Sequence, residues 1–374
     1  MNDFIIDFGD TPAPTDPQRT ACVALSEALS NGWKALTAPS LARASGTSSA
    51  PVRAFLLLDT WADNPLATEL LAGYPAQARS RHAVPDEMFK NREDEAPCLV
   101  WLPEALGPHA PPHTPDAVRA RQHLVDGLML ACEQARKRQV SQSLCGVIFS
   151  AAEPDEIVRH WASLGHQQAP DGSGARLFRY QDPRVMQRVW PLLTANQRQQ
   201  WLGPVRQWWS LAQPWGPWAP DIFSSAEAAE AVPKAAWVAC ESPPYADRQK
   251  DATRGALRAL FAPAQWHAAH VTPDANRVWQ GYAAARIAAD RQPDGDTVSR
   301  LLHDAAILGL TGGNRQDYVW CTWRHAAPPG APKETPWTSE PRAAVLQKIL
   351  KALQAQPDAR FGSLYAHLTQ QRHH

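Results

Sequence analysis

The sequence contains few cysteines, no long hydrophobic run and no excess of either charge. Its six cysteines are widely spaced and form no CxxC pair, which favours buried thiols in a reducing compartment over a disulfide or zinc framework. No stretch approaches the roughly 18 apolar residues that cross a bilayer, and the N-terminal residues lack the basic start and apolar core of a signal peptide. We therefore expect a cytoplasmic protein without membrane partners.

The charges balance, with 37 lysines and arginines against 37 aspartates and glutamates, so the net charge gives no general attraction to nucleic acid. A hydrophobic content of 44% is ordinary for a folded protein, and 374 residues are enough for two domains. The aromatic composition is unusual, because 16 tryptophans outnumber both the phenylalanines and the tyrosines. Tryptophan joins a large apolar face to one N–H donor, which suits cores and contact surfaces alike.

Strand and helix patterns alternate through the first two thirds of the chain. Four apolar runs predict strands, at residues 53–59, 97–102, 144–150 and 175–181. The longest helical pattern, 116–139, lies between the second and third of them, and the patterns after about residue 245 predict mainly helices. The predicted fold class is α/β, with a mixed sheet flanked by helices in the N-terminal lobe and a mainly α-helical C-terminal lobe.

These patterns also predict the domain organisation. Residues 1–50 are expected to form an N-terminal extension and linker, because they end in a run rich in Ala, Ser, Thr and Gly. Residues 51–245 are expected to form the α/β domain, and residues 246–374 the helical lobe.

A charged segment lies where the fourth predicted strand meets a helix. Asp182 is expected to cap that helix through a side-chain oxygen, and Pro183 suits the first helical position. A general base at Asp182 is the catalytic alternative, but pairing with Arg179 or Arg184 would lower its pKa and make it a poor base near neutral pH. We therefore expect Arg179, Asp182, Pro183 and Arg184 to form a structural motif, in which one arginine anchors the capping aspartate.

Four tryptophans are the candidate partner-binding residues: Trp208, Trp209, Trp215 and Trp218. On a strand, Trp208 and Trp209 would face opposite sides, so one would pack in the core while the other is displayed. The Pro and Gly residues around Trp215 and Trp218 favour a rigid loop that presents aromatic side chains, and such side chains often anchor interfaces. The alternative, that all four cover the seam between the two lobes, stays equally open.

Two histidines three residues apart, His267 and His270, could share a helix face and bind a metal. Zinc hydrolases of the HExxH type carry a Glu between the two histidines, but none lies between His267 and His270. No third ligand is evident nearby in the sequence, and both observations favour a packing role. The segment from Leu310 to Asn314 lacks the Lys-Ser/Thr of a phosphate loop and follows a predicted helix instead of opening one, so we expect a cap and turn there. No catalytic, cofactor-binding or metal-ligating residue is predicted.

Several of these elements, taken in order, resemble a known family, that of the domain of unknown function 4123. The matching pieces are Ala54 to Asp59, Phe89 with Ala96 to Val100, Gly146 to Ser150, Asp171-Gly172, Phe178 to Arg184 with the pattern FRYxDPR, and Leu202 to Val205 leading to Trp208. The resemblance covers roughly residues 52 to 245 and, more weakly, the helical remainder.

The members of that family are effector chaperones, also called effector adaptors, of type VI secretion systems. The resemblance implies a non-enzymatic adaptor that needs no cofactor and has an α/β adaptor domain. It implies binding and stabilisation of a cognate toxic effector through the effector's N-terminal region, and help in loading that effector onto the spike protein. Two alternatives stay open, a metal-dependent hydrolase using His267 and His270, and a structural component of a secretion assembly that binds no toxin.

Overall fold

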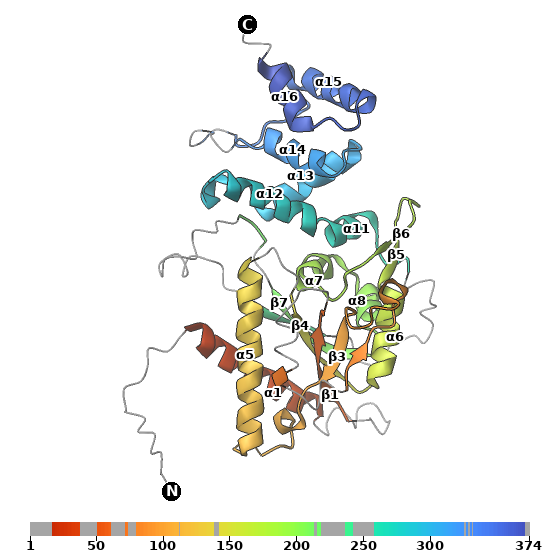
Figure 1. The fold of residues 1–374 in the computed structure, drawn as a ribbon, viewed down its shortest axis with the longest axis vertical. Coiled ribbons are helices and arrows are strands. Elements are labelled where there is room, and N and C mark those ends of the chain that lie inside the picture. The colour runs from red at the N-terminus through yellow and green to blue at the C-terminus, as the bar shows by residue number, and fades with distance from the viewer. Residues whose placement is uncertain are drawn as a thin grey trace. The chain divides into compact units, whose positions relative to one another are not determined.

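The computed structural model groups the chain into two compact units (Figure 1). The described residues are 17–37, 51–60, 72–73, 80–111, 113–137, 142–212, 215–217, 236–241, 258–324, 327, 330 and 332–370. The first unit holds the described residues up to Ser163, Gln199–Leu211 and residues 237–241; the second holds Leu164–Arg198, the described part of Ala212–Ala236 and the described residues from 258 onward. The domain boundaries after residues 50 and 245 stay predictions.

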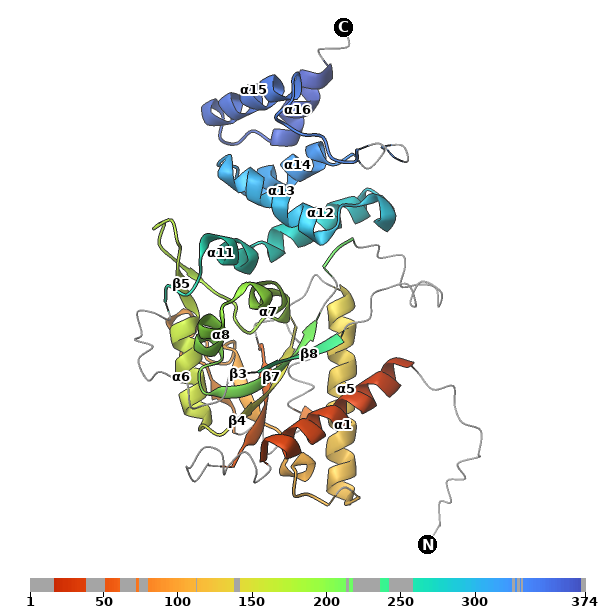
Figure 2. The ribbon, with the colours of Figure 1, turned by 180° about the vertical axis from the view of Figure 1, so that it is seen from behind.

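The first unit is built on a six-stranded sheet with the strand order β2-β3-β1-β4-β7-β8 (Figures 1 and 2). The strands are β1 (Arg53–Leu58), β2 (His82–Ala83), β3 (Cys98–Trp101), β4 (Leu144–Ser150), β7 (Val205–Ala212) and β8 (Ala236–Glu241). The pairs β1–β3, β1–β4, β2–β3 and β4–β7 are antiparallel. The strands predicted at residues 53–59, 97–102 and 144–150 correspond to β1, β3 and β4.

Helices accompany this sheet within the same unit. They are α1 (Pro17–Thr37), η1 (Glu87–Phe89), η2 (Glu104–Leu106), α5 (Pro115–Lys137) and α6 (Pro154–Leu164). α1 packs against α5, and an ion pair of 3.3 Å joins Arg19 to Asp126. In both views α1 and α5 lie together on one side of the sheet and α6 lies on the other (Figures 1 and 2).

The register of the strands explains why β1 and β4 are mainly apolar, apart from Arg53 and Ser150 at their ends. Phe55 of β1 lies opposite Trp101 and Ile148, and Ile148 lies opposite Trp208 of β7. Side chains alternate along a strand, so this row points to one face, where the ring of Trp161 from α6 lies 5.3 Å from that of Trp208. This face of the central strands is therefore buried under α6.

The opposite face of the sheet is covered from α1. The Trp33 ring of this helix lies 6.2 Å from that of Phe149 on β4, and its indole N–H donates to the Val52 carbonyl at 2.8 Å. One apolar contact and one hydrogen bond thus hold Trp33 against this face of the sheet.

The second unit contains a short hairpin of β5 (His166–Gln168) and β6 (Ala175–Leu177). The strand predicted at residues 175–181 is therefore shorter than expected, and it pairs with β5 instead of joining the six-stranded sheet. The turn between them contains Gly172 and Gly174, whose φ angles are 74° and 112°. Glycine adopts such angles without a Cβ clash, which allows the chain to fold back directly onto β5.

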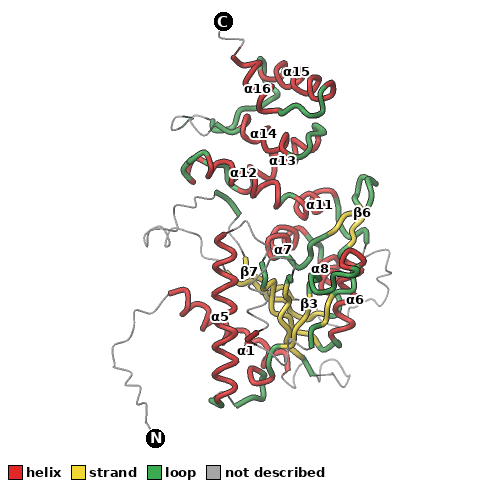
Figure 3. The backbone as a smooth tube through the Cα atoms, viewed as in Figure 1, coloured by secondary structure: helices red, strands yellow, loops and turns green. Residues whose placement is uncertain are grey.

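The remainder of the second unit is helical (Figure 3). Its helices are α7 (Pro183–Val189), η3 (Trp190–Leu192), α8 (Ala195–Leu202, whose last turn belongs to the first unit), α11 (Pro263–His270), α12 (Thr272–Ala284), η6 (Ala289–Arg291), α13 (Gly295–Ile307), α14 (Gly313–Thr322), α15 (Arg342–Ala355) and α16 (Phe361–Gln370). The predicted class, α/β with a helical C-terminal region, is confirmed. Among the residues described, no helix is both long and apolar enough to cross a bilayer.

Aromatic side chains fill the core of the α12–α16 helices. The rings of Tyr318 and Trp337 stack at 5.7 Å, and Phe361 meets both of them edge-on at the same distance. Tyr282 and Trp320 stack at 4.2 Å. Several of the tryptophans noted in the sequence therefore serve this core.

The expectation that the segment from Leu310 to Asn314 opens no helix is wrong. The segment from Leu310 to Asn314 does more than follow a helix, because Gly313 is the first residue of α14, and α13 has already ended near Gly309 at φ 75°. The start of α14 is occupied by protein groups: Asn314 Oδ1 accepts from the Phe361 N–H at 2.9 Å, and Arg360 lies over Gly313. These contacts dock α16 onto α14.

Candidate functional site

The charged segment at the start of α7 is a buried cap. Asp182 Oδ1 accepts from the backbone N–H of Arg184 at 3.0 Å, and Pro183 occupies the first helical position. The Arg184 guanidinium donates to both carboxylate oxygens, from Nε to Oδ1 at 2.9 Å and from Nη2 to Oδ2 at 2.6 Å. The Asp182 side chain is only 4% exposed, so this bidentate pair is desolvated.

The electrostatics of this cap argue against acid–base chemistry. Burial by itself would raise the pKa of Asp182, but the charge and hydrogen bonds of Arg184, together with the charge of Arg179, hold that pKa well below its usual range. A carboxylate with such a low pKa stays ionised at neutral pH and is a weak base. Its chemistry is that of an anchor for the helix.

Trp208 belongs to the core of the first unit. Its side chain has no exposed surface, and its indole lies against Gly146 of the neighbouring strand β4. A side chain in this position offers no area to a partner, so the structure assigns Trp208 to packing with Trp161.

Trp209 points to the other face of the sheet, as strand alternation predicts. It is half-buried, and its indole N–H donates to Gln207 Oε1 at 2.8 Å. Gln207 Nε2 in turn donates to Glu241 Oε1 of β8 at 2.6 Å. This chain of hydrogen bonds orients an aromatic side chain that keeps some exposed surface.

Trp215 is held firmly within the second unit. The Arg188 guanidinium lies 3.4 Å from the centre of its ring, and the Trp279 ring meets it edge-on at 4.9 Å. Gly295 approaches the indole so closely that a Cβ there would overlap it. Trp215 is half-buried by these contacts, and Trp218 lies outside the described residues. Partner binding by Trp209, Trp215 or Trp218 stays a prediction.

The two histidines considered as metal ligands make ordinary packing contacts. His267 Nε2 lies 2.9 Å from the Ser299 carbonyl oxygen, and its ring meets that of His303 at 4.8 Å. His270 Nδ1 lies 2.8 Å from the Trp266 carbonyl oxygen. Burial lowers the pKa of both His267 and His270, which favours neutral rings. Over the described ranges, no cluster of three or more His, Cys, Asp or Glu side chains is arranged to hold a metal ion.

The described members of the charged and aromatic sets singled out from the sequence cap helices, fill cores or extend polar networks. Their described contacts are those of structural residues in an α/β unit and a helical unit, and a fold of this kind does not by itself define an activity. The particular family follows from comparison with known proteins.

Residues 54–200 match the family described as domain of unknown function (DUF4123). The matched segment extends from β1 to α8 and includes the Asp182 cap. DUF4123 is a family of type VI secretion effector chaperones or adaptors and is not a known enzyme family. The resemblance predicted from the sequence is thereby confirmed over these residues. No curated protein and no solved structure matches the chain.

Proposed function

We propose that this protein is an effector-specific chaperone and adaptor of a bacterial type VI secretion system. It binds the N-terminal region of a cognate toxic effector in the cytoplasm, stabilises it and helps load it onto the spike protein. The observation that carries this proposal is the DUF4123 match over residues 54–200. The adaptor acts by binding alone, without catalysis and without a cofactor.

The described contacts are compatible with a binding role. Trp209 combines a half-buried indole ring with an N–H already satisfied by Gln207, so further burial of the ring would not leave a donor unpaired. Burial of such oriented aromatic surface is a common source of affinity between proteins.

Co-expression tests the chaperone part of the proposal. A candidate effector is produced with and without this protein, and its amount and solubility are compared. We expect more soluble effector in the presence of the chain and co-purification of the two. Equal levels of soluble effector in both cultures, with no co-purification, would contradict a chaperone and favour a structural component that binds no toxin.

The loading step has a separate test. Purified spike protein is mixed with the effector in the presence and absence of the chain, and the complexes are separated by size. We expect the effector to elute with the spike only when the chain has been added. Effector that binds the spike equally well alone would contradict the loading role while leaving the chaperone role intact.

A further inference from the structure

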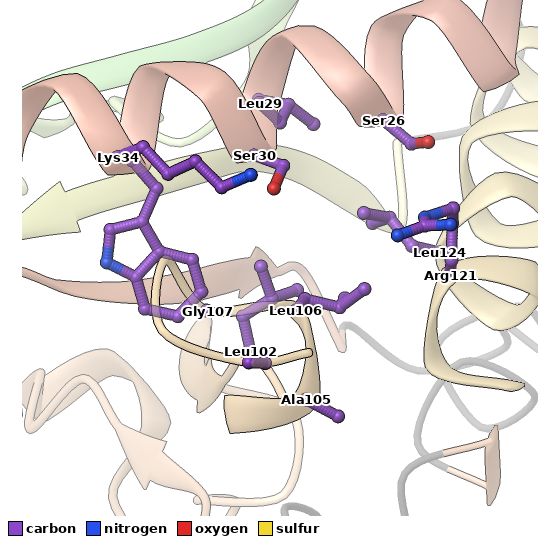
Figure 4. Close-up of a pocket in the computed structure, with 12 residues that line it drawn as sticks. Ser26, Leu29, Ser30, Lys34, Leu102, Ala105, Leu106, Gly107, Arg121 and Leu124 are labelled. Atoms are coloured by element: carbon purple, nitrogen blue, oxygen red, sulfur yellow. The ribbon is translucent and has the colours of Figure 1, made fainter. Parts of the chain in front are cut away.

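A small pocket lies in the first unit between α1, the η2 segment and α5 (Figure 4). Its lining residues come from three separate parts of the chain: Ser26, Leu29, Ser30, Trp33, Lys34, Leu102, Ala105, Leu106, Gly107, Ala110, Arg121 and Leu124. The volume of the pocket is about 30 Å³. The pocket therefore has room for a small group such as the end of one side chain.

Helical periodicity brings five of these residues to one face of α1. Ser26, Leu29, Ser30, Trp33 and Lys34 are spaced by three, one, three and one along the helix. Figure 4 shows this face directed at the η2 segment, with Arg121 and Leu124 of α5 at the side. The walls are fixed, since Trp33 is hydrogen-bonded to Val52 and the Ser26 hydroxyl donates to the Val23 carbonyl.

The floor of the pocket is apolar and buried. Leu29, Leu102 and Leu124 are each less than 5% exposed, and Leu106 is 8% exposed. A leucine-sized side chain beside the opening extends this apolar surface and removes it from water. Apolar contact by itself, however, would not select between partners.

The charge of the pocket supplies the selectivity. Lys34 and Arg121 are the charged residues that line it, and no Asp or Glu does. Within the described part of the chain, neither cation is paired with a carboxylate: Lys34 is exposed and Arg121 is half-buried. Two cations beside an apolar floor are complementary to a carboxylate that is flanked by apolar side chains.

We propose that this pocket binds a peptide segment of a partner protein in which an Asp or Glu is flanked by leucine-sized residues. The carboxylate lies between Lys34 and Arg121, and the flanking side chains cover Leu102 and Leu106. The inference rests on the proposed function in that the effector is the partner that supplies the segment.

Fluorescence anisotropy with the full chain tests the proposal. The probe is a short fluorescein-labelled peptide with Leu-Glu-Leu at its centre between Gly and Ser residues, and the matched control carries Leu-Gln-Leu. We expect the glutamate peptide to bind at least about tenfold more tightly, and its affinity to fall as NaCl is raised. Equal affinity for the two peptides, or no binding of either, would overturn the proposal.

Charge reversal at the pocket identifies the residues involved. Lys34→Glu and Arg121→Glu should each weaken binding of the glutamate peptide by about tenfold or more. Arg119→Glu is the matched control, because Arg119 is exposed on the same helix and does not line the pocket. We expect it to leave the affinity unchanged, and all three variants to unfold at the wild-type temperature. Equal losses in all three would show a general charge effect and refute the site.

Three further outcomes distinguish the pocket proposal from the chaperone proposal and from binding of a second copy of the chain. If the peptides are not distinguished but the chain still stabilises a co-expressed effector, the pocket proposal fails and the chaperone proposal stands. If the glutamate peptide binds through Lys34 and Arg121 but no effector is stabilised, the chaperone proposal fails alone. Sedimentation of a dimer that Lys34→Glu dissociates would assign the pocket to a second copy of the chain and overturn the proposal.

Discussion

At the residue scale, Asp182 illustrates a carboxylate whose low pKa serves stability. Its partners are the Arg184 guanidinium and the first-turn N–H of α7; the carboxylate is buried, and the Arg184 side chain is 11% exposed. When one member of a buried pair is removed, the other is left charged without a counterion, which costs more than the loss of a cap alone.

We expect Asp182→Asn to lower the free energy of unfolding by at least about 2 kcal/mol at pH 7. The folded-state pKa of Asp182 lies below its unfolded value of about 3.9, so its stabilising contribution is complete above that pH and is lost as the pH falls toward the lower folded value. The wild type and the variant should therefore approach each other in stability below about pH 4. Urea unfolding at several pH values measures this difference.

The exposed Asp171 is the matched control, because its carboxylate accepts from the Ser173 N–H in a surface turn and is not buried. Asp171→Asn should leave the unfolding midpoint close to that of the wild type. A difference between wild type and Asp182→Asn that stays constant from pH 7 to pH 3 would contradict the ion-pair account.

At the element scale, the contact between β4 and β7 depends on a glycine. A Cβ added at Gly146 would overlap the Trp208 indole and come within 2.7 Å of the Trp209 carbonyl oxygen. Neither group can move easily, since one belongs to the core and the other to the backbone of the adjacent strand. The absence of a side chain at Gly146 therefore leaves room for the Trp208 indole.

We expect Gly146→Ala to destabilise the first unit by about 1–3 kcal/mol through overpacking. Gly32→Ala on α1 is the opposite case, because its Cβ would meet nothing nearer than Gln207 Oε1 at 3.5 Å, an ordinary contact. Alanine has the higher helix propensity, so this variant should gain up to about 1 kcal/mol. Urea unfolding of both variants measures whether each substitution raises or lowers the free energy of unfolding. Destabilisation by Gly32→Ala would contradict the expectation for α1.

Elements with strong local signals were predictable, and those that depend on pairing were not. The periodic pattern predicted α5 nearly to its ends, and the cap at Asp182 followed from three adjacent residue types. The pairing of β6 with β5 could not be predicted, because the residue pattern of a short strand does not specify which other strand it pairs with. The candidate pocket was missed for a similar reason, since the spacing of Ser26 to Lys34 marks a helix face but not the segment opposite it.

At the scale of the whole molecule, the second unit joins residues that are far apart in the chain. The Phe178 ring meets the Phe261 ring edge-on at 4.7 Å, and α7 packs against α11. Gln197 Nε2 donates to the Leu260 carbonyl at 2.6 Å. A domain that ended at residue 245 would lose all of these contacts.

We expect a fragment of residues 1–245 to expose Phe178 and its neighbours, to bind a hydrophobic dye and to aggregate. The full chain under the same conditions is the control. Dye fluorescence and size-exclusion chromatography measure the outcome. A monomeric fragment with a cooperative unfolding transition would instead support the boundary predicted after residue 245.

The sequence by itself determined the local features of this protein: helix starts at Pro183 and near Pro115, buried apolar strands, and the ordered elements that mark residues 54–200 as a DUF4123 segment. These features depend on neighbours a few residues apart, which any reading of the chain contains. Only the tertiary structure decided that Trp208 fills a core, that Trp215 is held by Arg188, and that Lys34 and Arg121 share one pocket. Those outcomes depend on which distant segments meet, and composition and periodicity do not encode that directly.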